Sequence, residues 1–406
     1  MTGDDMFKSF RVLLDEAVPS VTADEAMARS RHRDAKVRGR SLVGPRRLLG
    51  AGLALALTAG VIGAVAATSA PSDRIAGQHL PTRTRSVLRQ GWIISSLAGP
   101  RFGFDHTGPI IVTGHHGLVS NAHSIIEFSA ANATNAHVLP GWAERFGRPL
   151  SMVVVDSRLY VLNGKKNLLA ELSLGTGSLI RSFRGPFRSA GAMAYASGHL
   201  WLANTGPDTS SVVELNPATG RVVRRLRSLR YGFSDPSAMC VAGTNLWVAD
   251  TGGPALTELD ARTGQLVRIV PSRRVAPAGS YDIQAPISIA CERGHLWIVN
   301  YYEGDSIAEF SARSGDLLRL IPAARLGVRT PLQVAAENGH LWLAAAAPAP
   351  GPGSVVEINP ATGAVERRFS AAATGVRLLP ESIAVSNGNH VFVSLGSDSI
   401  TEIHRR

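Results

Sequence analysis

Short apolar runs recur at a regular interval along most of this chain, and turns rich in Gly, Pro and Asn separate them. One phrase marks the runs, and its copies read GHLWLAN (198–204), TNLWVAD (244–250), GHLWIVN (294–300), GHLWLAA (339–345) and, more weakly, SRLYVLN (157–163), NHVFVSL (389–395) and PIIVTG (109–114). From Tyr160 to Phe392 the aromatic residue of this phrase recurs every 41 to 50 residues. A period of this length indicates a repeat architecture.

A second phrase follows the first in each unit and contains a tight turn. It reads SVVELNPATGRVVRRL at 211–226 and SVVEINPATGAVERRF at 354–369. Asn, Pro and Gly supply the backbone geometry of the turn, so each unit reads as four short strands. One glutamate of this phrase is present in all seven units, as Glu127, Glu171, Glu214, Glu258, Glu309, Glu357 and Glu402. Because it recurs in the third strand, we interpret it as structural, pairing with backbone or with an arginine of the next strand.

Repeats of 40–50 residues with four strands each predict the blades of a β-propeller. The seventh unit, at about 380–406, supplies only three strands before the sequence ends. Gly91–Leu97, ahead of the first unit, reads as a fourth strand without a sheet. Placing it in the last blade closes the ring and removes exposed edges. We therefore predict an all-β, seven-bladed propeller with four-stranded blades over residues 87–406.

These phrases resemble a known group of proteins. GHLW-type strands followed by VVEL-NPATG turns are similar to the NHL/YncE/streptogramin-lyase-like group of seven-bladed propellers, over about residues 87–406. The resemblance implies the fold. It implies little about function, because the group includes binding ectodomains, scaffolds and a few enzymes. The lyases of the group depend on a histidine and a metal at the channel mouth, and neither is carried over to a residue of this sequence.

A long apolar segment precedes the repeats. Leu48–Thr68 contains no charged residue, and the next charge is Asp73. This length suffices to cross a hydrocarbon core of about 30 Å. Basic residues cluster between Arg29 and Arg47, so the positive-inside rule keeps the N-terminus in the cytoplasm. We predict a single-pass cell-membrane protein with four parts: a basic cytoplasmic segment (1–47), a transmembrane helix (48–68), a linker (69–86) and an extracytoplasmic propeller (87–406).

Two features of this segment have alternative interpretations. Ala64-Val65-Ala66 resembles the cleavage site of a secretory signal, so a cleaved leader is the alternative to an anchor. Small residues recur every fourth position, at Gly52, Ala56, Gly60, Ala64 and Thr68. Such a stripe can pair two membrane helices into a dimer, although an Ala/Gly-rich composition explains it equally well.

The charge of the chain narrows the choice of partners. The formal net charge is +11, from 42 Lys+Arg and 31 Asp+Glu. No recognition-helix or RNA-binding signature accompanies this charge, so we expect no nucleic-acid partner. For an extracytoplasmic domain, an anionic envelope polymer or a protein partner is the expected counterpart.

Arginine and tyrosine are concentrated in the long loops between the predicted blades. In a propeller these loops share one face around the central channel, where guanidinium groups can bind carboxylate, phosphate or sugar ligands. The candidate binding residues are Arg145, Arg148, Arg230, Arg273, Arg274, Arg325, Arg329, Tyr231, Tyr281, Tyr301 and Tyr302. The alternative is an ordinary solvated surface in an Arg-rich protein.

Histidines suggest a second kind of site. His115, His116 and His123 lie in the loop TGHHGLVSNAH and are candidate metal ligands. Four others precede equivalent second strands, and we interpret them as turn residues because equivalent positions on neighbouring blades lie too far apart for one ion. They are His199, His295, His340 and His390.

The remaining chemistry is sparse. Cys240 and Cys291 fall at equivalent places in two first strands, and we predict two buried free thiols, because strands of adjacent blades are expected to lie too far apart for a bridge. No GxSxG, HExxH, CxxC or P-loop pattern is present, and we expect no cofactor. The leading hypothesis is therefore a binding ectodomain, a possible sensor or scaffold, rather than an enzyme. The alternative is a metal-dependent lyase-like or hydrolase propeller that uses the His115 loop.

Overall fold

The computed structural model describes residues 83–87, 92–98, 103–142, 147–163, 166–187, 189–206, 210–253, 255–275, 280–301, 305–346, 353–370, 380–388, 390–396 and 399–405. All of them belong to one compact unit, which covers Leu49–Arg406. The predicted cytoplasmic segment and membrane helix lie outside the described residues. Among the helices that are described, none has the length and apolar character needed to cross a membrane.

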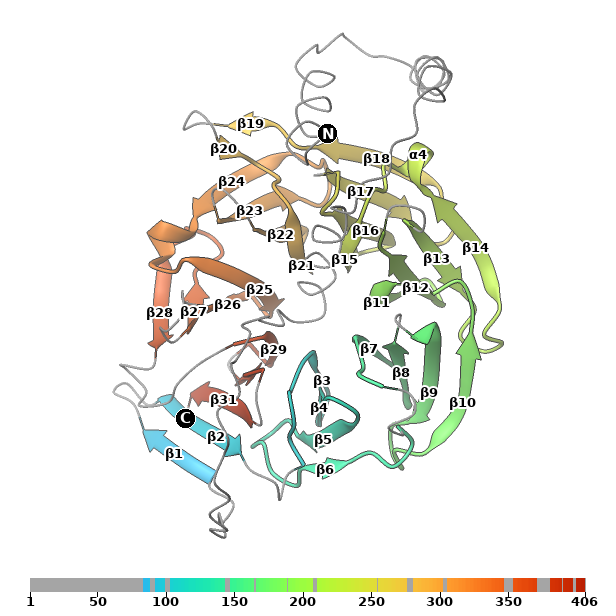
Figure 1. Ribbon diagram of the computed structural model, residues 1–406. Coiled ribbons are helices and arrows are strands. Elements are labelled where there is room, and N and C mark those ends of the chain that lie inside the picture. Colours follow the sequence, from blue (N-terminus) through green and yellow to red (C-terminus); the bar gives the residue numbers. More distant parts are fainter. Residues whose placement is uncertain are drawn as a thin grey trace, which may run out of the picture. The chain divides into compact units, whose positions relative to one another are not determined.

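Seven antiparallel sheets stand around a common axis, so the predicted seven-bladed propeller is confirmed (Figure 1). The innermost strands are β3 (Ile110–Thr113), β7 (Ser151–Val155), β11 (Ala190–Ala196), β15 (Pro236–Ala242), β21 (Pro286–Glu292), β25 (Thr330–Glu337) and β29 (Ser382–Ser386). The second strands are β4 (His116–Ser120), β8 (Arg158–Asn163), β12 (His199–Asn204), β16 (Asn245–Asp250), β22 (His295–Asn300), β26 (His340–Ala346) and β30 (His390–Ser394). The third strands are β5 (Ile125–Ser129), β9 (Leu168–Ser173), β13 (Ser211–Leu215), β17 (Ala255–Asp260), β23 (Ser306–Ser311), β27 (Ser354–Ile358) and β31 (Ser399–Arg405). The fourth strands are β6 (His137–Val138), β10 (Leu179–Arg184), β14 (Val222–Arg227), β18 (Leu266–Pro271), β24 (Leu317–Pro322), β28 (Val365–Ser370) and β2 (Trp92–Ala98).

The hydrophobic pattern of each strand follows from its place in the blade. Second strands such as β12 and β16 are buried over nearly their whole length, because both of their faces pack against neighbouring blades. Fourth strands such as β10 alternate between half-buried and exposed residues. They form the outer edge, where one face meets water. The core therefore consists of apolar clusters between successive blades rather than one central cluster.

The ring closes through the N-terminal strand, as predicted. β2 pairs antiparallel with β31, so it supplies the fourth strand of blade 7. Trp92 of β2 packs against Trp342 and Phe369 of blade 6, with ring centroids 5.9 and 5.4 Å away. The structure adds a fifth strand, β1 (Arg83–Val87), which pairs with the outer edge of β2. The predicted linker at 69–86 is thus partly strand.

The recurring glutamate has the structural role predicted for it. In blades 2 to 6 its side chain is at most 2% exposed and forms an ion pair with an arginine of the fourth strand. The pairs are Glu171–Arg181, Glu214–Arg224, Glu258–Arg268, Glu309–Arg319 and Glu357–Arg367. The other carboxylate oxygen contacts the residue that begins the second strand, which is Arg158, His199, Asn245, His295 or His340. The histidines at this position are therefore partners of a buried acid as well as turn residues.

Several of these arginines also connect one blade to the next. Arg181 donates to the carbonyl oxygens of Pro217 and Ala218, which lie in the turn before the fourth strand of blade 3. Arg268 and Arg319 make the same contact with the corresponding turns of blades 5 and 6. One guanidinium thus neutralises a buried acid in its own blade and holds the backbone of the following blade.

The prediction of two buried free thiols is wrong. Cys240 of β15 and Cys291 of β21 form a disulfide, with their Cα atoms 5.7 Å apart, and both residues are half-buried. The prediction used the spacing of about 10 Å that is usual for packed sheets. Innermost strands converge on the propeller axis, however, and neighbouring ones approach more closely than the blades do on average.

We predict that this disulfide contributes strongly to stability. It closes a loop with a sequence separation of 51 residues, and the lost entropy of the unfolded chain amounts to about 4 kcal/mol. Reduction should therefore lower the unfolding midpoint in a thermal melt. The control is the Cys240→Ala/Cys291→Ala variant, whose midpoint should already be low and should not respond to reductant. An unchanged midpoint in the reduced native protein would contradict the prediction.

Candidate binding site

A pocket of about 260 Å³ opens at the outer rim between blades 4 and 5. After β18 the chain forms a hairpin from β19 (Arg274–Val275) and β20 (Ser280–Tyr281) before it enters blade 5. The pocket lies between this hairpin, the end of β18 and the turn that precedes β24. Its walls include Arg273, Arg274, Asp282, Asp316, Phe310 and Leu317.

Local hydrogen bonds hold the charged walls in place. Asp282 is buried, and its Oδ1 accepts the backbone N–H groups of Arg273 and Ile283 at 2.5 and 2.9 Å. Burial raises the pKa of Asp282 above its ordinary value, and these two hydrogen bonds oppose the rise. The Nε of Arg274 donates to the hydroxyl of Tyr281 at 3.0 Å, and its guanidinium lies 5.8 Å from that ring.

This arrangement suits an anionic, hydroxylated ligand. Arg273 and Arg274 are exposed, and a guanidinium can bind a carboxylate or phosphate with two parallel hydrogen bonds. Leu317 is half-buried and gives the pocket an apolar part that a sugar ring can cover, while Asp316 offers acceptors for hydroxyl groups. The pocket therefore combines the contacts that an acidic sugar requires.

The structure brings some of the predicted binding residues together and leaves others apart. Arg273, Arg274 and Tyr281 share the hairpin. Arg230 lies over Tyr231, 5.8 Å from its ring, in the short helix α4 (Ser228–Tyr231) between blades 3 and 4.

The others are distributed around the ring. Arg325 in η4 (Ala323–Leu326) and Arg329 are exposed between blades 5 and 6, where Tyr301 is half-buried against the core. Arg145 and Tyr302 lie outside the described residues. A continuous basic face made from all of these residues stays a prediction.

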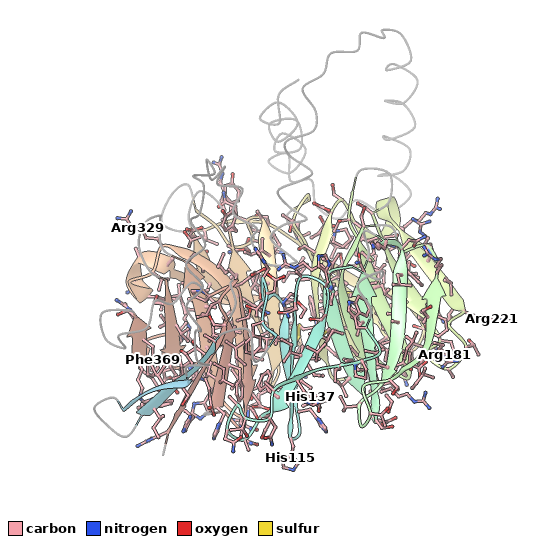
Figure 2. All side chains as sticks on the ribbon, turned by 60° about the horizontal axis from the view of Figure 1, so that its bottom comes forward. His115, His137, Arg181, Arg221, Arg329 and Phe369 are labelled. Carbon is pink, nitrogen blue, oxygen red and sulfur yellow. A yellow bond between two sulfur atoms is a disulfide. The ribbon has the colours of Figure 1, made fainter. Side chains whose placement is uncertain are left out.

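The predicted histidine cluster does not gather at one point. His115 and His116 lie at the turn between β3 and β4, whereas His123 lies in the turn between β4 and β5. At about 3.3 Å per residue, the five residues of β4 separate these turns by roughly 13 Å. Figure 2 shows His115 at the end of the blades opposite to Arg329. His116 instead pairs through Nδ1 with Glu127, in the way its counterparts do in other blades.

Two buried acids at the connections between blades were not predicted from the sequence. Asp250 ends β16 and accepts the backbone N–H groups of Ser234, Asp235 and Gly253. Burial raises the pKa of Asp250 to about 6. A usable signal existed, because a polar residue ends most second strands and is an aspartate only in TNLWVAD.

The second missed acid is Glu381, which lies just before β29. It accepts a hydrogen bond from Arg148, whose Nη2 lies 2.8 Å from the Glu381 carboxylate, and this ion pair joins the start of blade 7 to the start of blade 2. The Glu381 side chain is only 7% exposed. Burial outweighs the attraction of Arg148 and raises the pKa of Glu381 to about 7. Arg148, a predicted ligand-binding residue, therefore has a structural partner.

Comparison with known proteins agrees with the class that the fold defines, a repeat-built seven-bladed propeller with a pocket at its rim. Residues 131–369 match the PQQ_2 family, described as outer membrane protein assembly factor BamB. The match covers more than half of the chain, so the chain belongs to this family. No curated protein sequence matches the chain significantly.

Solved propellers superpose on the chain at low sequence identity. A streptogramin B lyase gives a TM-score of 0.62 at 13% identity, covering 79% of this chain and 100% of the lyase. The virginiamycin B lyase of Staphylococcus aureus gives 0.59 at 13% identity, over 78% and 100%. The Pan2 WD40 domain of Neurospora crassa gives 0.58 at 11% identity, over 76% and 94%. At these identities the likeness extends to the fold alone, so none of these activities is transferred.

We predict that Glu381 makes stability fall as the pH rises. Its pKa in the folded protein is about 7, while the ordinary value of 4.5 applies in the unfolded chain. Between these values the unfolded chain has lost this proton and the folded protein retains it, so stability is lost as the pH rises through this window, by at most about 3 kcal/mol. The unfolding midpoints measured in thermal melts at pH 5 and at pH 8 should therefore differ less for Glu381→Gln than for the native chain. The exposed Glu366→Gln should not, and equal behaviour of the two variants would contradict the assignment.

Proposed function

We propose that this chain is a membrane-anchored, extracytoplasmic propeller that binds an anionic glycan of the cell envelope in its rim pocket. The observation that carries the proposal is the pair Arg273 and Arg274, exposed beside an apolar surface and two carboxylates within one pocket. Guanidinium groups in this setting favour carboxylate or phosphate groups over neutral ligands. The propeller is then a receptor or scaffold, and NHL/YncE-like ectodomains provide a functional analogy.

Two observations support the proposed location. Residues 48–68 form an apolar segment with basic residues on its N-terminal side, which favours a cytoplasmic N-terminus. The disulfide between Cys240 and Cys291 belongs in an oxidising compartment, since such bonds are rare in the cytoplasm. Anionic polymers are abundant outside the membrane, where the positive net charge of residues 69–406 favours their approach. Pairing of the membrane helices would present two propellers side by side.

We predict that the two arginines are required for binding. The probes are a uronic-acid oligosaccharide and a glycerol-phosphate oligomer, titrated calorimetrically into the full chain in detergent. Arg273→Ala/Arg274→Ala should weaken binding of the preferred probe at least tenfold, because each lost charge-assisted contact is worth about 1.5–3 kcal/mol. The control Arg184→Ala/Arg221→Ala removes the same charge from exposed positions in blades 2 and 3, away from the pocket, and should bind normally.

The outcomes separate the possible ligands. Binding of the uronate alone indicates a sugar carboxylate, and binding of the glycerol phosphate alone indicates a phosphodiester polymer. Equal losses in both variants would mean that only net charge matters. Absence of binding to either probe would refute the proposed ligand class and leave a protein partner as the next candidate.

We also predict the orientation in the membrane. Alkaline phosphatase becomes active only where its own disulfides form. Fused after Arg406 in a bacterial host, it should be active, and fused before Leu48 it should be inactive. The chain should also remain with the membrane after alkaline washing. A released, shortened product would instead support the cleaved leader.

A further inference from the structure

Blade 7 departs from the rule that the other complete blades follow. In blades 2 to 6 the third-strand glutamate faces an arginine of the fourth strand. In blade 7 the fourth strand is β2, and the residue paired with Glu402 is Ser95. Ser95 is buried and carries no charge. The buried acid of this blade therefore lacks the arginine that neutralises its counterparts.

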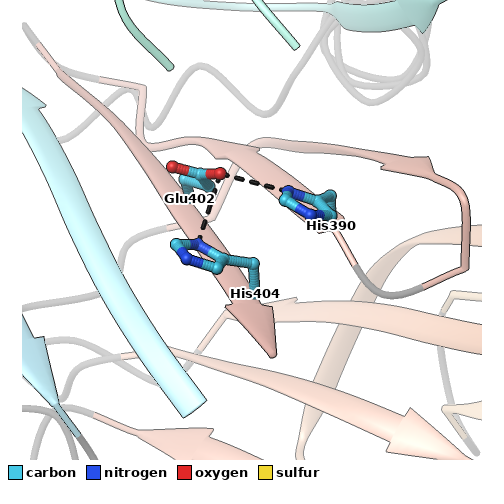
Figure 3. A group of neighbouring side chains, drawn as sticks. All are labelled: His390, Glu402 and His404. Carbon is cyan, nitrogen blue, oxygen red and sulfur yellow. Dashed lines mark hydrogen bonds and ion pairs between the residues drawn. The ribbon is translucent and has the colours of Figure 1, made fainter. Parts of the chain in front are cut away.

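Two histidines take the place of that arginine (Figure 3). His390 begins β30, and its Nδ1 lies 3.2 Å from Oε1 of Glu402. His404 follows Glu402 by two residues on the same strand face, and its Nδ1 lies 3.3 Å from the same oxygen. The two residues are directly opposite each other across β30 and β31, with rings parallel to within 3° and centroids 5.1 Å apart.

The closure of the ring explains why His404 can occupy its position. In blades 1 to 6 the residue two places after the glutamate begins the turn to the fourth strand, and it is always Ser, Asn or Asp, namely Ser129, Ser173, Asn216, Asp260, Ser311 and Asn359. These side chains accept turn N–H groups, as Asn216 and Asp260 do. Blade 7 has no such turn, because its fourth strand comes from the N-terminal part of the chain. Position 404 is thereby free to carry a ligand residue.

The charge of this cluster is incomplete without a cation. The Glu402 side chain is fully buried, and its Oε2 accepts no hydrogen bond from any residue the structure describes. A buried carboxylate without a compensating charge is costly. One ligand atom from each of His390, Glu402 and His404 lies within 4.8 Å of the other two, and the described residues contain no second group of this kind.

We propose that His390, Glu402 and His404 form a binding site for one divalent transition-metal ion of the Zn²⁺ class. Two imidazoles and one carboxylate are a ligand set that Zn²⁺ prefers. Metal–ligand bonds of about 2.0–2.2 Å bring ligand atoms roughly 3.5 Å apart, so rotation of the two rings about their side-chain bonds completes the site. The His390 and His404 side chains are 23% and 19% exposed, which leaves the ion a path from solvent and a position for water. The ion supplies the positive charge that arginine supplies in blades 2 to 6.

Metal binding can be tested on the full chain, purified in detergent through a tag without histidine and stripped with chelator. Titration with Co²⁺ should give one equivalent with visible d–d absorption, and Zn²⁺ should displace it. Zn²⁺ should raise the unfolding midpoint by mass action. His404→Ala should weaken Co²⁺ binding at least a hundredfold. Ser95→Arg should also abolish it while preserving the fold, because the variant restores the arginine of blades 2 to 6.

Two controls assign the site to blade 7. His340→Ala removes the histidine equivalent to His390 from blade 6, where Arg367 already neutralises Glu357. His137→Ala removes a histidine that lies 3.7 Å from Glu127 in blade 1. Both should keep one equivalent of Co²⁺. Absence of Co²⁺ absorption in the native chain, normal binding by His404→Ala and Ser95→Arg, or equal loss in either control would overturn the proposal.

Discussion

The buried ion pair between a third-strand glutamate and a fourth-strand arginine is the contact on which the ring most depends. In blade 4 the Nε of Arg268 lies 2.5 Å from Glu258, and the same guanidinium holds the backbone carbonyl of Ser314 in blade 5. Removing one partner of such a pair leaves a buried charge and costs about 3–5 kcal/mol. The net stabilisation relative to an apolar pair is far smaller. The pair instead fixes how successive blades pack, because the turn of each blade contacts the arginine of the blade before it.

In this ring one blade is assembled from both ends of the domain, and that blade does not repeat the pattern. The turn that links third and fourth strands elsewhere is missing from blade 7, together with its arginine. Apolar packing partly compensates for the missing ion pair, since Trp92 packs against Trp342 and Phe369 in a cluster of three rings. The carboxylate of Glu402 contacts His390 and His404 instead of an arginine. A departure from the repeat is informative here because blades 2 to 6 show that the fourth strand normally carries an arginine opposite the glutamate.

Features that repeat could be predicted from the sequence, whereas several features that occur once could not. Seven glutamates at a regular interval located the third strands, and the missing fourth strand of the last unit located β2. The disulfide was missed because the usual distance between packed sheets does not take account of the convergence of β15 and β21 at the axis. His123 was grouped with His115 because they are near in sequence. Successive turns of a blade lie at opposite ends of its strands, however, and this rule could have separated the two histidines. The His390–Glu402–His404 cluster needed the pairing register of β30 and β31, which the repeat phrase alone does not give.

The rim pocket and the disulfide belong to the same two blades, and this coincidence has a physical consequence. The Cys240–Cys291 bond ties the innermost strands of blades 4 and 5, while the pocket lies where their outer edges meet. Two sheets tied at the inner edge and bridged at the outer edge by Arg268 have little freedom to splay. The binding proposed for this pocket would then require little reordering of the protein, and such reordering is a large part of the entropic cost of association. The hairpin that forms one wall of the pocket has strands of only two residues. The connections between blades 4 and 5 therefore supply a rigidity that the hairpin alone would not have.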